Sequence, residues 1–393
     1  MINFNTLDDF QSIYGFRNAQ PQYTVNFTKA FVGSKVMHLE QNYRSTQTII
    51  GASNDVIRNN KDQIQKKVFS TNKVGEKIRY RECSSNTEEG LYVASEINYL
   101  VNDKSFNKKY SYKDFAVLYR TNSQSRAIED ALLALKIPYN LVGGVGFYSR
   151  KEVKDIMAYL RLKSNPYDEI AFKRILKTYK GVGDKRISDL ILIAKANNLD
   201  LITILDIVTE PKAILPSLRY VSSIFSSSMS DYPFDFMEHV VTQTHCLEAY
   251  DREGTEEAKA RKENVLELLN IAKESDYLGL TGFVDHVALS SKEDGKKNPD
   301  AVTLMTIHSA KGLEYTGVLV VGVEENILPH ANSKGNEKNL EEERRLMYVA
   351  MTRAKEFLFL TNSEKRKEYN KETHNPVSRF IREINKKYIQ EII

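Results

Sequence analysis

The stretch "AVTLMTIHSAKGLEYTGVLVVGV", residues 301–323, decides the fold class of this chain. It holds two runs of mostly β-branched or apolar residues, Val302–Ile307 and Val318–Val323, separated by a short segment that is a turn or a brief helix. Strands that are covered on both faces have such unbroken apolar runs, whereas strands with one wet face alternate. The stretch therefore predicts two strands of a parallel sheet that helices cover on both sides.

Other segments repeat this alternation of a buried strand and an amphipathic helix. In residues 35–60 a Ser45/Thr46 cap opens a helix after a short apolar run. Residues 340–363, "LEEERRLMYVAMTRAKEFLFLTNS", predict a helix over Leu340–Ala354 that leads directly into a strand. The further strands predicted in this way are Val36–Leu39, Phe115–Tyr119, Tyr139–Val142 and Phe357–Thr361.

The strand signal fades between Gly143 and about Pro299, where amphipathic helices such as "RKEVKDIMAYLRLKSNP" predominate. The segment Ser290–Asp300 is polar and contains Gly and Pro, as linkers do. We therefore predict an α/β fold in which a parallel-sheet domain is interrupted by a mostly helical insertion. The two halves of the sheet domain are residues 33–142 and 300–393.

Composition sets wide limits on function. The chain has 393 residues, which favours two or three domains, and a net charge of +4, which allows a polyanionic partner without requiring one. Two cysteines and seven scattered histidines indicate a reducing compartment and no metal site. The start resembles no signal peptide, and no apolar stretch could cross a bilayer. We predict a cytoplasmic protein without a membrane partner.

Two polar stretches follow predicted strands, where open α/β sheets bind ligands. In "EQNYRST", Arg44 stands just before a helix start and could fork onto phosphate oxygens, while Tyr43 offers a face for a purine. The alternative is a surface Arg44 paired with Glu40.

In "HSAKGLEY", His308, Lys311 and Glu314 would project from one tight turn. Lys311 could contact phosphate and Glu314 could accept a ribose hydroxyl. The alternative is an ordinary polar turn.

Arg353 ends the predicted helix whose inner face is Leu346, Val349 and Ala350. An arginine held by such packing is either an arginine finger, which stabilises charge on a transferring phosphoryl group, or half of a buried ion pair. For the second alternative, the candidate partners are Glu341 to Glu343.

Two further stretches fit nucleic acid. In "TYKGVGDKRISDLI" the backbone N–H groups around Gly181 and Gly183 could contact a phosphate, with Lys185 adding charge, although a simple helix-capping turn is the alternative. In "LDDFQSIYGFRNAQ", residues 7–20, the segment from Gln11 to Arg17 combines groups that read phosphate with aromatic rings that stack on bases.

Taken in order, "QSIYGFR", "LEQNYRST", "YRTNSQSR", "GGVGFYSRKEVKDIMAYLR", "VTLMTIHSAKGLEY", "LPH" and "EEERRLMYVAMTRAK" resemble the UvrD/PcrA/Rep family of superfamily 1 DNA helicases. The resemblance runs from about residue 7 to 361. It implies two RecA-like motor domains, 1A and 2A, with insertions 1B and 2B. On this basis residues 1–32 are the remnant of 1A, residues 33–142 and 300–393 form 2A, and residues 143–299 form 2B.

The resemblance also implies residue roles around ATP. Gln11 matches the glutamine that senses the γ-phosphate, and Arg44 matches a γ-phosphate arginine. Tyr43 matches the residue that stacks on adenine, Glu314 the ribose contact, and Arg353 the arginine finger.

For DNA, the resemblance implies that Tyr14 and Phe16 stack on bases of the single strand and that Arg17 contacts its backbone. His308 and Lys311 match a DNA-facing segment. The resemblance also assigns a contact with duplex DNA to the Gly181–Lys185 turn.

Four departures from the family pattern limit what this chain can do alone. Phe10 precedes Gln11 where an acidic residue is usual, and Asn18 stands where glycine is usual. No stretch matches GxxxxGK[ST], and no strand-borne acidic pair for Mg²⁺ is present. ATP with Mg²⁺ is thus expected in the complete helicase and is not expected to bind stably to this chain by itself.

Two hypotheses follow. The chain is the C-terminal half of a 3′→5′ ATP-dependent DNA helicase, or it is a non-catalytic module that binds DNA or a partner. The expected partners are single-stranded and duplex-junction DNA and the absent N-terminal motor domain, in cis or in trans. We also expect residues 1 to about 32 to be poorly anchored, and hinges near Gly143/Gly144 and Ser290–Asp300.

Overall fold

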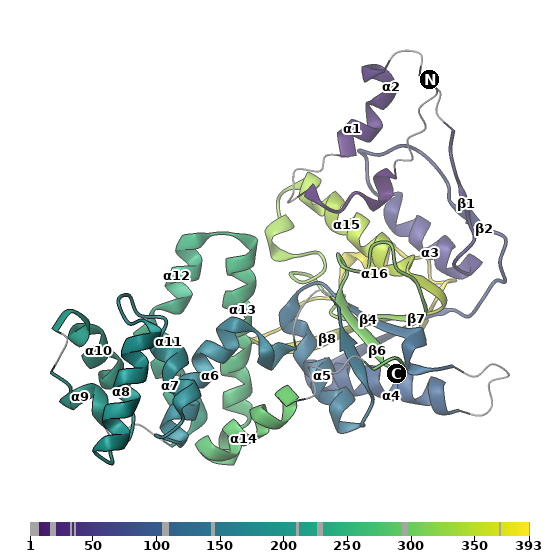
Figure 1. Ribbon diagram of the computed structural model, residues 1–393. Helices are drawn as coiled ribbons and strands as arrows, with labels where there is room; N and C mark the ends of the chain where they lie inside the picture. Colours follow the sequence, from purple (N-terminus) through teal and green to yellow (C-terminus); the bar gives the residue numbers. More distant parts are fainter. Residues whose placement is uncertain are drawn as a thin grey trace. The chain divides into compact units, whose positions relative to one another are not determined.

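The computed structural model describes residues 8–15, 21–31, 34, 37–103, 110–142, 146–209, 212–225, 231–292, 298–368 and 371–392. The chain divides into two compact units (Figure 1). Unit 1 comprises Met1–Gly144, Lys297–Arg366 and Glu372–Ile393. Unit 2 comprises Val145–Lys296 and Lys367–Lys371.

Unit 1 is built on a parallel sheet with the strand order β10-β3-β8-β7-β4-β6-β5, and β9 pairs with β8 at one side. Each neighbouring pair along this path runs parallel. The strands are β3 (Ile78–Ser85), β4 (Phe115–Tyr119), β5 (Tyr139–Leu141), β6 (Val302–Thr306), β7 (Tyr315–Val320), β8 (Ala354–Glu368), β9 (Lys371–Thr373) and β10 (Ile389–Glu391).

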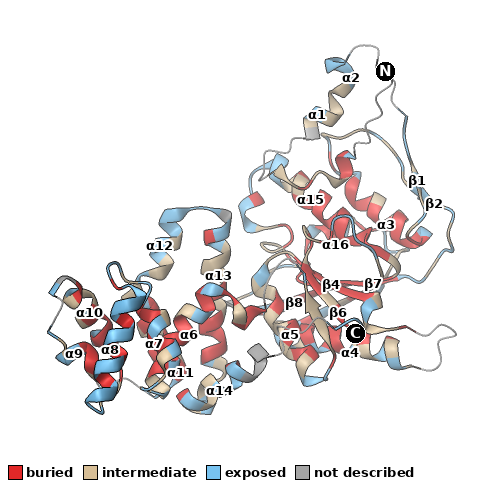
Figure 2. Ribbon diagram, viewed as in Figure 1, coloured by how far each residue is buried: buried red, intermediate tan, exposed pale blue. Residues whose placement is uncertain are grey.

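Helices cover both faces of this sheet. Successive strand residues point to opposite faces, so each strand contributes apolar side chains to both layers of helices. Ala116 and Leu118 of β4 pack with α3, α15 and α16, whereas Phe115, Val117 and Tyr119 pack with α4 and α5. Figure 1 shows α3 and α15 on one side of the strands and α4 and α5 on the other, and Figure 2 shows the strands between them as buried. The helices are α3 (Gln47–Ile57), α4 (Asn86–Asn102), α5 (Ser125–Ala134), α15 (Glu337–Met351) and α16 (Arg379–Glu383).

The predicted α/β fold with a helical interruption is confirmed, but one predicted strand is wrong. Met37 to Glu40 form no strand, and only β1 (Gln41–Asn42) pairs, with β2 (Phe69–Ser70). Met37 and Leu39 are 84% and 79% exposed, so this apolar run does not join the sheet core. Its hydrophobicity alone favours a buried strand, which is why the prediction fails here.

The expectation that the first residues are poorly anchored is wrong for residues 8–15, which we call the anchor segment. This segment contains a short 3₁₀ helix, η1 (Asp9–Gln11), and its Phe10 and Ile13 are buried. Phe10 packs edge-on against Tyr348 of α15, with ring centroids 5.4 Å apart, and Asp9 pairs with Lys66 at 2.8 Å. Unit 1 itself therefore supplies apolar partners for this segment.

The described residues after the anchor segment form two short helices, α1 (Pro21–Val25) and α2 (Phe27–Ala30). Neither contributes a described side chain to a buried core, and Tyr23 is 72% exposed. Gln22 donates a hydrogen bond to Asp62 at 2.6 Å. The packing found for residues 8–15 therefore does not extend to this pair of helices.

Unit 2 is helical among the residues that are described, with one apolar core shared by most of its helices. Figure 2 draws the inner faces of helices such as α6, α8 and α11 as buried. Its helices are α6 (Lys151–Ser164), α7 (Glu169–Leu176), α8 (Asp184–Ala196), α9 (Thr203–Ile207), α10 (Leu215–Phe225), α11 (Pro233–Thr244), α12 (Cys246–Glu253), α13 (Glu256–Glu274) and α14 (Gly279–Lys292).

Two further observations complete the fold. Gly143 and Gly144, the first expected hinge, and much of the second lie outside the described residues. In the part of the chain that is described, no helix combines the length and the apolar character needed to span a bilayer.

Candidate nucleotide and nucleic-acid site

Arg353 lies between the end of α15 and the start of β8, and its side chain is almost wholly buried at 2% exposure. Its guanidinium donates to the carbonyl oxygens of Val349 and Leu313, at 3.1 and 3.2 Å. It also donates to the Thr352 hydroxyl at 3.2 Å and to Gln11 Oε1 at 3.3 Å. These four acceptors are all uncharged.

Burial and, to a smaller extent, the nearby positive charge of Arg44 together lower the pKa of Arg353 to about 10. The alternative of a buried ion pair with Glu341 to Glu343 is not what forms. Glu341 accepts from the Lys61 N–H at 2.7 Å, Glu342 from the Gly15 N–H at 2.7 Å, and Glu343 pairs with Arg120 at 2.8 Å. The three carboxylates lie about three helical turns before Arg353, and each binds a different segment.

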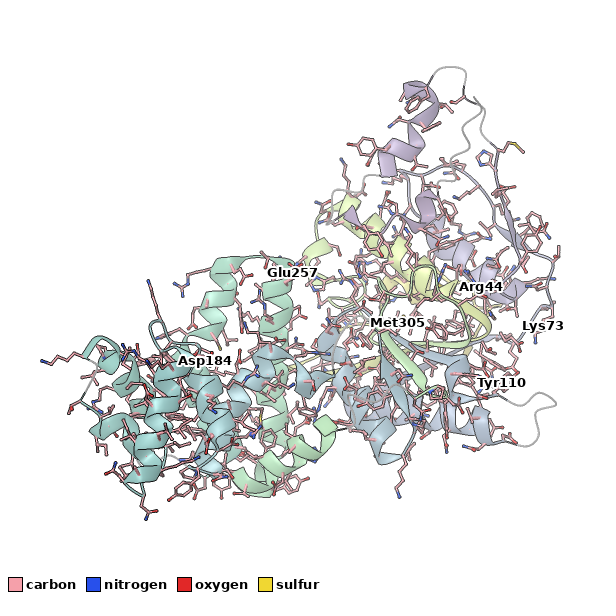
Figure 3. The ribbon with its side chains drawn as sticks, viewed as in Figure 1. Arg44, Lys73, Tyr110, Asp184, Glu257 and Met305 are labelled. Carbon is pink, nitrogen blue, oxygen red and sulfur yellow. The ribbon has the colours of Figure 1, made fainter. Side chains whose placement is uncertain are left out.

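Arg44 lies beside the start of β8. Its Nε pairs with Glu314 at 2.7 Å and its Nη1 donates to the Thr352 carbonyl at 3.1 Å. Figure 3 labels Arg44 in unit 1. The alternative pairing with Glu40 does not form, because Glu40 accepts from the Lys67 N–H at 2.9 Å instead.

Glu314 is shared between two cations, Arg44 and Lys355, the second at 2.9 Å. Hydrogen bonds from Lys355 and Arg44 lower the pKa of Glu314 to about 2. We call Arg44, Arg353, Lys355 and Glu314 the basic cluster. It carries three positive charges and one negative charge, so it has a surplus that suits an anion such as a phosphate group.

Tyr43 is 76% exposed next to the basic cluster in the sequence. Its hydroxyl donates a hydrogen bond to Oε1 of Gln41, two residues earlier in the chain, at 3.0 Å. An exposed aromatic ring beside a cationic cluster can stack on a planar base.

Gln11 connects the anchor segment to the basic cluster. Its side-chain oxygen accepts from Arg353, its side-chain nitrogen donates to Asp8 at 2.5 Å, and its carbonyl accepts from Lys311 Nζ at 2.8 Å. The structure therefore brings Gln11, Arg353 and Lys311 together, although more than 290 residues separate the first from the other two in the sequence.

Tyr14, His308 and Lys311 form a second group. The Tyr14 hydroxyl donates to the His308 carbonyl at 3.3 Å, and the two rings lie 6.5 Å apart. Lys311 Nζ lies 5.2 Å from the centroid of the Tyr14 ring. A half-exposed tyrosine with a lysine over its ring offers both a stacking face and a positive charge.

The two groups lie at opposite ends of the strands. His308 follows the carboxyl end of β6, as the binding rule for open sheets predicts, but Glu314 and Arg353 directly precede β7 and β8. The prediction that both marked places lie beyond carboxyl ends is therefore wrong for Glu314. The anchor segment bridges the two ends, because Gln11 contacts Arg353 and Tyr14 contacts His308.

The remaining predicted residues are not part of these groups. Phe16 and Arg17 lie outside the described residues. Gly181, Gly183 and Lys185 belong to unit 2 and are exposed, the two glycines between α7 and α8 and Lys185 in the first turn of α8.

Gly181 needs its glycine because its φ is +87°, a conformation that side chains rarely adopt. Gly183 is the N-cap of α8, and Asp184, labelled in Figure 3, pairs with Lys177 of α7 at 2.7 Å.

Three important residues were missed by reasoning from the sequence. Lys355 completes the basic cluster, and Glu342 and Arg345 hold the anchor segment. Nothing in the local pattern marks Lys355. The charged run "EEERR" did signal an unusual helix, but its partners are too distant in sequence to be read from it.

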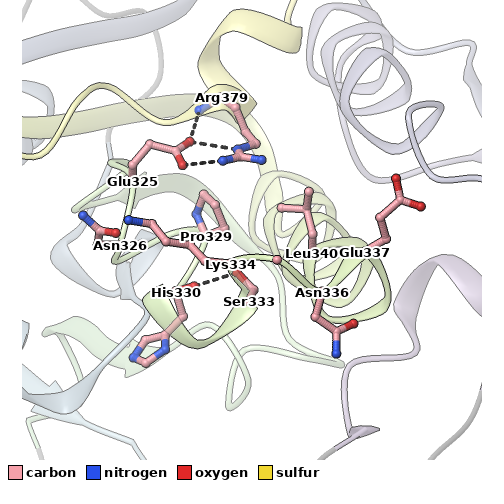
Figure 4. A pocket seen from close by; sticks show the side chains of 11 residues that line it. Glu325, Asn326, Pro329, His330, Ser333, Lys334, Asn336, Glu337, Leu340 and Arg379 are labelled. Carbon is pink, nitrogen blue, oxygen red and sulfur yellow. Dashed lines mark hydrogen bonds and ion pairs between the residues drawn. The ribbon is translucent and has the colours of Figure 1, made fainter.

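A cavity of unit 1 lies elsewhere. It has a volume of about 250 Å³ and lies between the loop after β7, the start of α15 and the start of α16 (Figure 4). Glu325 and Arg379 pair at 2.7 Å on its wall, so part of its charge is already compensated. It includes none of the predicted residues, whereas Tyr43 and Glu314 are exposed on an open face. Because the chemistry of phosphate binding needs surplus charge, we assign the candidate site to the basic cluster.

Within the described ranges, no group of three or more His, Cys, Asp or Glu side chains could hold a metal ion.

Comparison with known proteins shows the family of the chain. The family model of the UvrD-like helicase C-terminal domain matches residues 37–365, which is most of the chain. The chain belongs to the UvrD-like helicase C-terminal domain family. This match covers the basic cluster and His308, and it begins after the anchor segment.

Two curated relatives extend the match to nearly the whole chain. The chain is 39% identical to the ATP-dependent DNA helicase PcrA of Bacillus subtilis (strain 168) and 35% identical to that of Staphylococcus aureus (strain Mu50), in each case over 96% of this chain and 53% of the relative. It therefore spans about half the length of the curated relatives it matches. Among solved structures, the C-terminal domain of a possible DNA helicase from Lactobacillus plantarum WCFS1 covers 89% of this chain and 98% of that chain, at 11% identity and a TM-score of 0.36, which is too low to carry an argument.

Proposed function

We propose that this chain supplies the C-terminal half of a 3′→5′ ATP-dependent DNA helicase of the UvrD/PcrA type, and that it acts in the cytoplasm. In this role the described units correspond to domain 2A and its helical insertion 2B. ATP with Mg²⁺ would bind where a second motor region, in cis or in trans, faces the basic cluster. Single-stranded and duplex-junction DNA are the proposed nucleic-acid partners.

The observation that carries this proposal is the environment of Arg353. The Arg353 guanidinium is buried, its hydrogen-bond acceptors are neutral and a second arginine lies nearby. Its lowered pKa means that this environment disfavours the charged form of the side chain. A buried charge without a counter-ion is unfavourable unless an anion arrives. A γ-phosphoryl group entering this site would supply that anion, which is the task of an arginine finger.

The other cluster residues have matching roles in the proposal. Arg44 would contact the phosphates, and its present partner Glu314 would release it in part and accept a ribose hydroxyl. Tyr43 would stack on the adenine. Gln11, which already contacts Arg353, would respond to the γ-phosphate.

Tyr14, His308 and Lys311 would face the single strand, with Phe16 and Arg17 following along the chain. A base stacked on Tyr14 would contribute about 1–3 kcal/mol. Because Gln11 and Tyr14 are three residues apart in the anchor segment, occupancy of the nucleotide site and of the DNA site would be coupled through this short stretch.

The basic cluster holds cations but no loop that cradles phosphates, and no GxxxxGK[ST] stretch occurs in the sequence. We therefore expect no DNA-stimulated ATP hydrolysis by the purified 393-residue chain. The test is an ATPase assay with and without single-stranded oligonucleotide. Robust DNA-stimulated turnover by the chain alone would overturn the proposal.

A second candidate function is a non-catalytic module that binds DNA or a partner. The turn at Gly181 favours it, because exposed glycine N–H groups lie there beside exposed Lys180, Lys185 and Arg186. Such a module would bind duplex or junction DNA weakly and with a steep dependence on salt. Fluorescence anisotropy of labelled DNA at about 50 and 200 mM salt distinguishes the cases: binding that Lys185→Ala weakens supports the module, and no binding at low salt by the folded chain contradicts it.

A further inference from the structure

Two side chains of α15 form hydrogen bonds with the backbone of the anchor segment. Arg345 Nε donates to the Ser12 carbonyl at 3.0 Å, and the Glu342 carboxylate accepts from the Gly15 N–H at 2.7 Å. Residues three apart lie on the same face of a helix, so one face of α15 forms hydrogen bonds with both ends of the stretch 12–15. Ile13, inside that stretch, is fully buried.

Gly15 lies in close contact with the carboxylate of Glu342. A Cβ atom added there would come too close to Glu342 Oε2 and would lie 2.8 Å from the other carboxylate oxygen. Any side chain at position 15 must therefore displace the Glu342 carboxylate, and with it the hydrogen bond to the backbone. The glycine and the glutamate form one contact, made of a hydrogen bond and a steric fit.

These two hydrogen bonds fix the backbone on either side of Tyr14. Its hydroxyl donates a hydrogen bond to the His308 carbonyl, and Lys311 Nζ lies 5.2 Å from the centroid of its ring. Ile13 is part of the buried core beside α15, and Tyr14 packs against the edge of the same core while remaining partly exposed. The same helix leads to Arg353, eleven residues beyond Glu342, or about 16 Å along the axis.

We propose that Glu342 and Arg345 are positioning residues that fix the Tyr14 ring for stacking on a base of single-stranded nucleic acid. The inference rests on the proposed function in one respect, the nature of the ligand. The positioning itself concerns this chain alone and can be measured without DNA. It also gives α15 a second task, since Glu342 and Arg345 in its middle bind the backbone on either side of Tyr14, while its C-terminal end leads to Arg353.

The sequence provides a clean reporter for this claim. The chain contains no tryptophan, so Tyr14→Trp introduces a single indole, which can be excited selectively, at the position in question. In this background we would compare Glu342→Ala, Glu342→Gln, Gly15→Ala and the double variant Gly15→Ala/Glu342→Ala. The matched control is Glu337→Ala, which removes an exposed glutamate from the first turn of the same helix.

Without DNA, Glu342→Ala and Gly15→Ala should each lower the steady-state anisotropy of the introduced indole and shift its emission to longer wavelength. Glu342→Gln keeps an acceptor oxygen for the Gly15 N–H and should retain the signal of the Tyr14→Trp parent. Glu337→Ala should leave it unchanged. Loss of signal only in variants whose thermal unfolding is also altered throughout would indicate a merely structural role and would contradict the proposal.

With oligo(dT), Glu342→Ala should weaken binding roughly 5- to 150-fold, the range for the loss of one base stack. Gly15→Ala should do the same. If the clash with Glu342 is the cause, the double variant should bind no more weakly than Glu342→Ala alone. Additive losses, or an unchanged indole signal and affinity in Glu342→Ala, would overturn the proposal.

The two proposals fail in different ways. If the parent chain does not bind oligo(dT), the DNA-binding part of the proposed function fails, while the indole signal still decides whether Glu342 orients position 14. If DNA binds but the indole signal does not respond to Glu342→Ala, only the positioning role is wrong.

Discussion

Arg366 and Arg353 of unit 1 are both buried, but they differ in the charge of their partners and in the direction in which their pKa is shifted. Arg366 lies between two buried carboxylates, Glu89 at 2.7 Å and Glu324 at 2.8 Å. Despite the cost of burial, these charges raise the pKa of Arg366, whereas burial and Arg44 lower that of Arg353 to about 10. We call Arg366, Glu89 and Glu324 the buried triad.

The difference supports the separate roles that we propose for the two arginines. The triad joins three parts of the sheet unit, because Glu89 also accepts from the Gly322 N–H and the Thr361 hydroxyl, and Glu324 accepts from the Ser363 N–H. Its charges are satisfied within the protein, so it serves the fold. The four acceptors that bind the Arg353 guanidinium are neutral, which is why we propose that its charge serves a ligand.

The largest expected effect comes from breaking the triad. Arg366→Met leaves two buried carboxylates without their cation, and we expect a loss of about 3–5 kcal/mol in the free energy of unfolding of unit 1. Hydrogen exchange of the β3 and β8 amides measures this unit separately from the helical one. A loss below about 1 kcal/mol would show that the triad does not serve the fold.

The same change at the other arginine should cost much less. Arg353→Met removes a charge that the protein holds at a cost, together with four hydrogen bonds to neutral acceptors. These effects oppose one another, so we expect the stability of unit 1 to change by no more than about 1 kcal/mol. Hydrogen exchange of the same β8 amides gives the comparison. A loss as large as that of Arg366→Met would remove the contrast between the two arginines.

A smaller effect is expected from Glu314, whose folded pKa is about 2 against an ordinary value of 4.5. Because the pKa is lowered, the carboxylate stabilises the folded state above about pH 4.5, and this contribution disappears as the pH falls towards 2. The side chain is 45% exposed, so solvent screening keeps the effect small. The stability difference between the parent and Glu314→Gln should narrow between about pH 5 and pH 2.5, and a difference that stays constant over this range would contradict the assignment.

The smallest effect is expected at Glu337, whose pair with Lys61 is largely exposed on both sides. Glu337→Gln should change the free energy of unfolding by less than about 0.5 kcal/mol. It serves as the reference for a charge removed from α15 without consequence. A substantial loss measured by urea denaturation would mean that exposed charge on this helix matters in general.

The sequence was sufficient for the elements with unbroken apolar runs. Phe115–Tyr119 forms a strand with the predicted bounds, and the helix that leads to Arg353 differs by three residues at each end. Asn336 caps that helix through its side chain, which accepts from the Asn339 N–H at 3.2 Å, a start that the apolar pattern alone does not reveal. The exposed run at Met37 to Leu39 misled because hydrophobicity does not say whether a neighbouring strand exists.

For the candidate site, residue identities could be predicted but partners could not. Arg44 and Glu314 were each recognised separately, yet their 2.7 Å pairing joins positions 270 residues apart. The same holds for the anchor segment, whose Phe10 contacts Tyr348 of α15 and whose Ser12 carbonyl accepts from Arg345. Such contacts depend on how the strands are ordered in the sheet, which no local pattern encodes.

The most direct test of the central claim is ATP hydrolysis in a mixture. The chain, as parent or as Arg353→Met, would be combined with the separately expressed remainder of Bacillus subtilis PcrA and single-stranded DNA. We predict DNA-stimulated turnover only when both halves are present, with kcat reduced by about 10³–10⁵ in the Arg353→Met mixture. Equal turnover with the parent and the variant chain would contradict the claim that Arg353 is held ready for a phosphate.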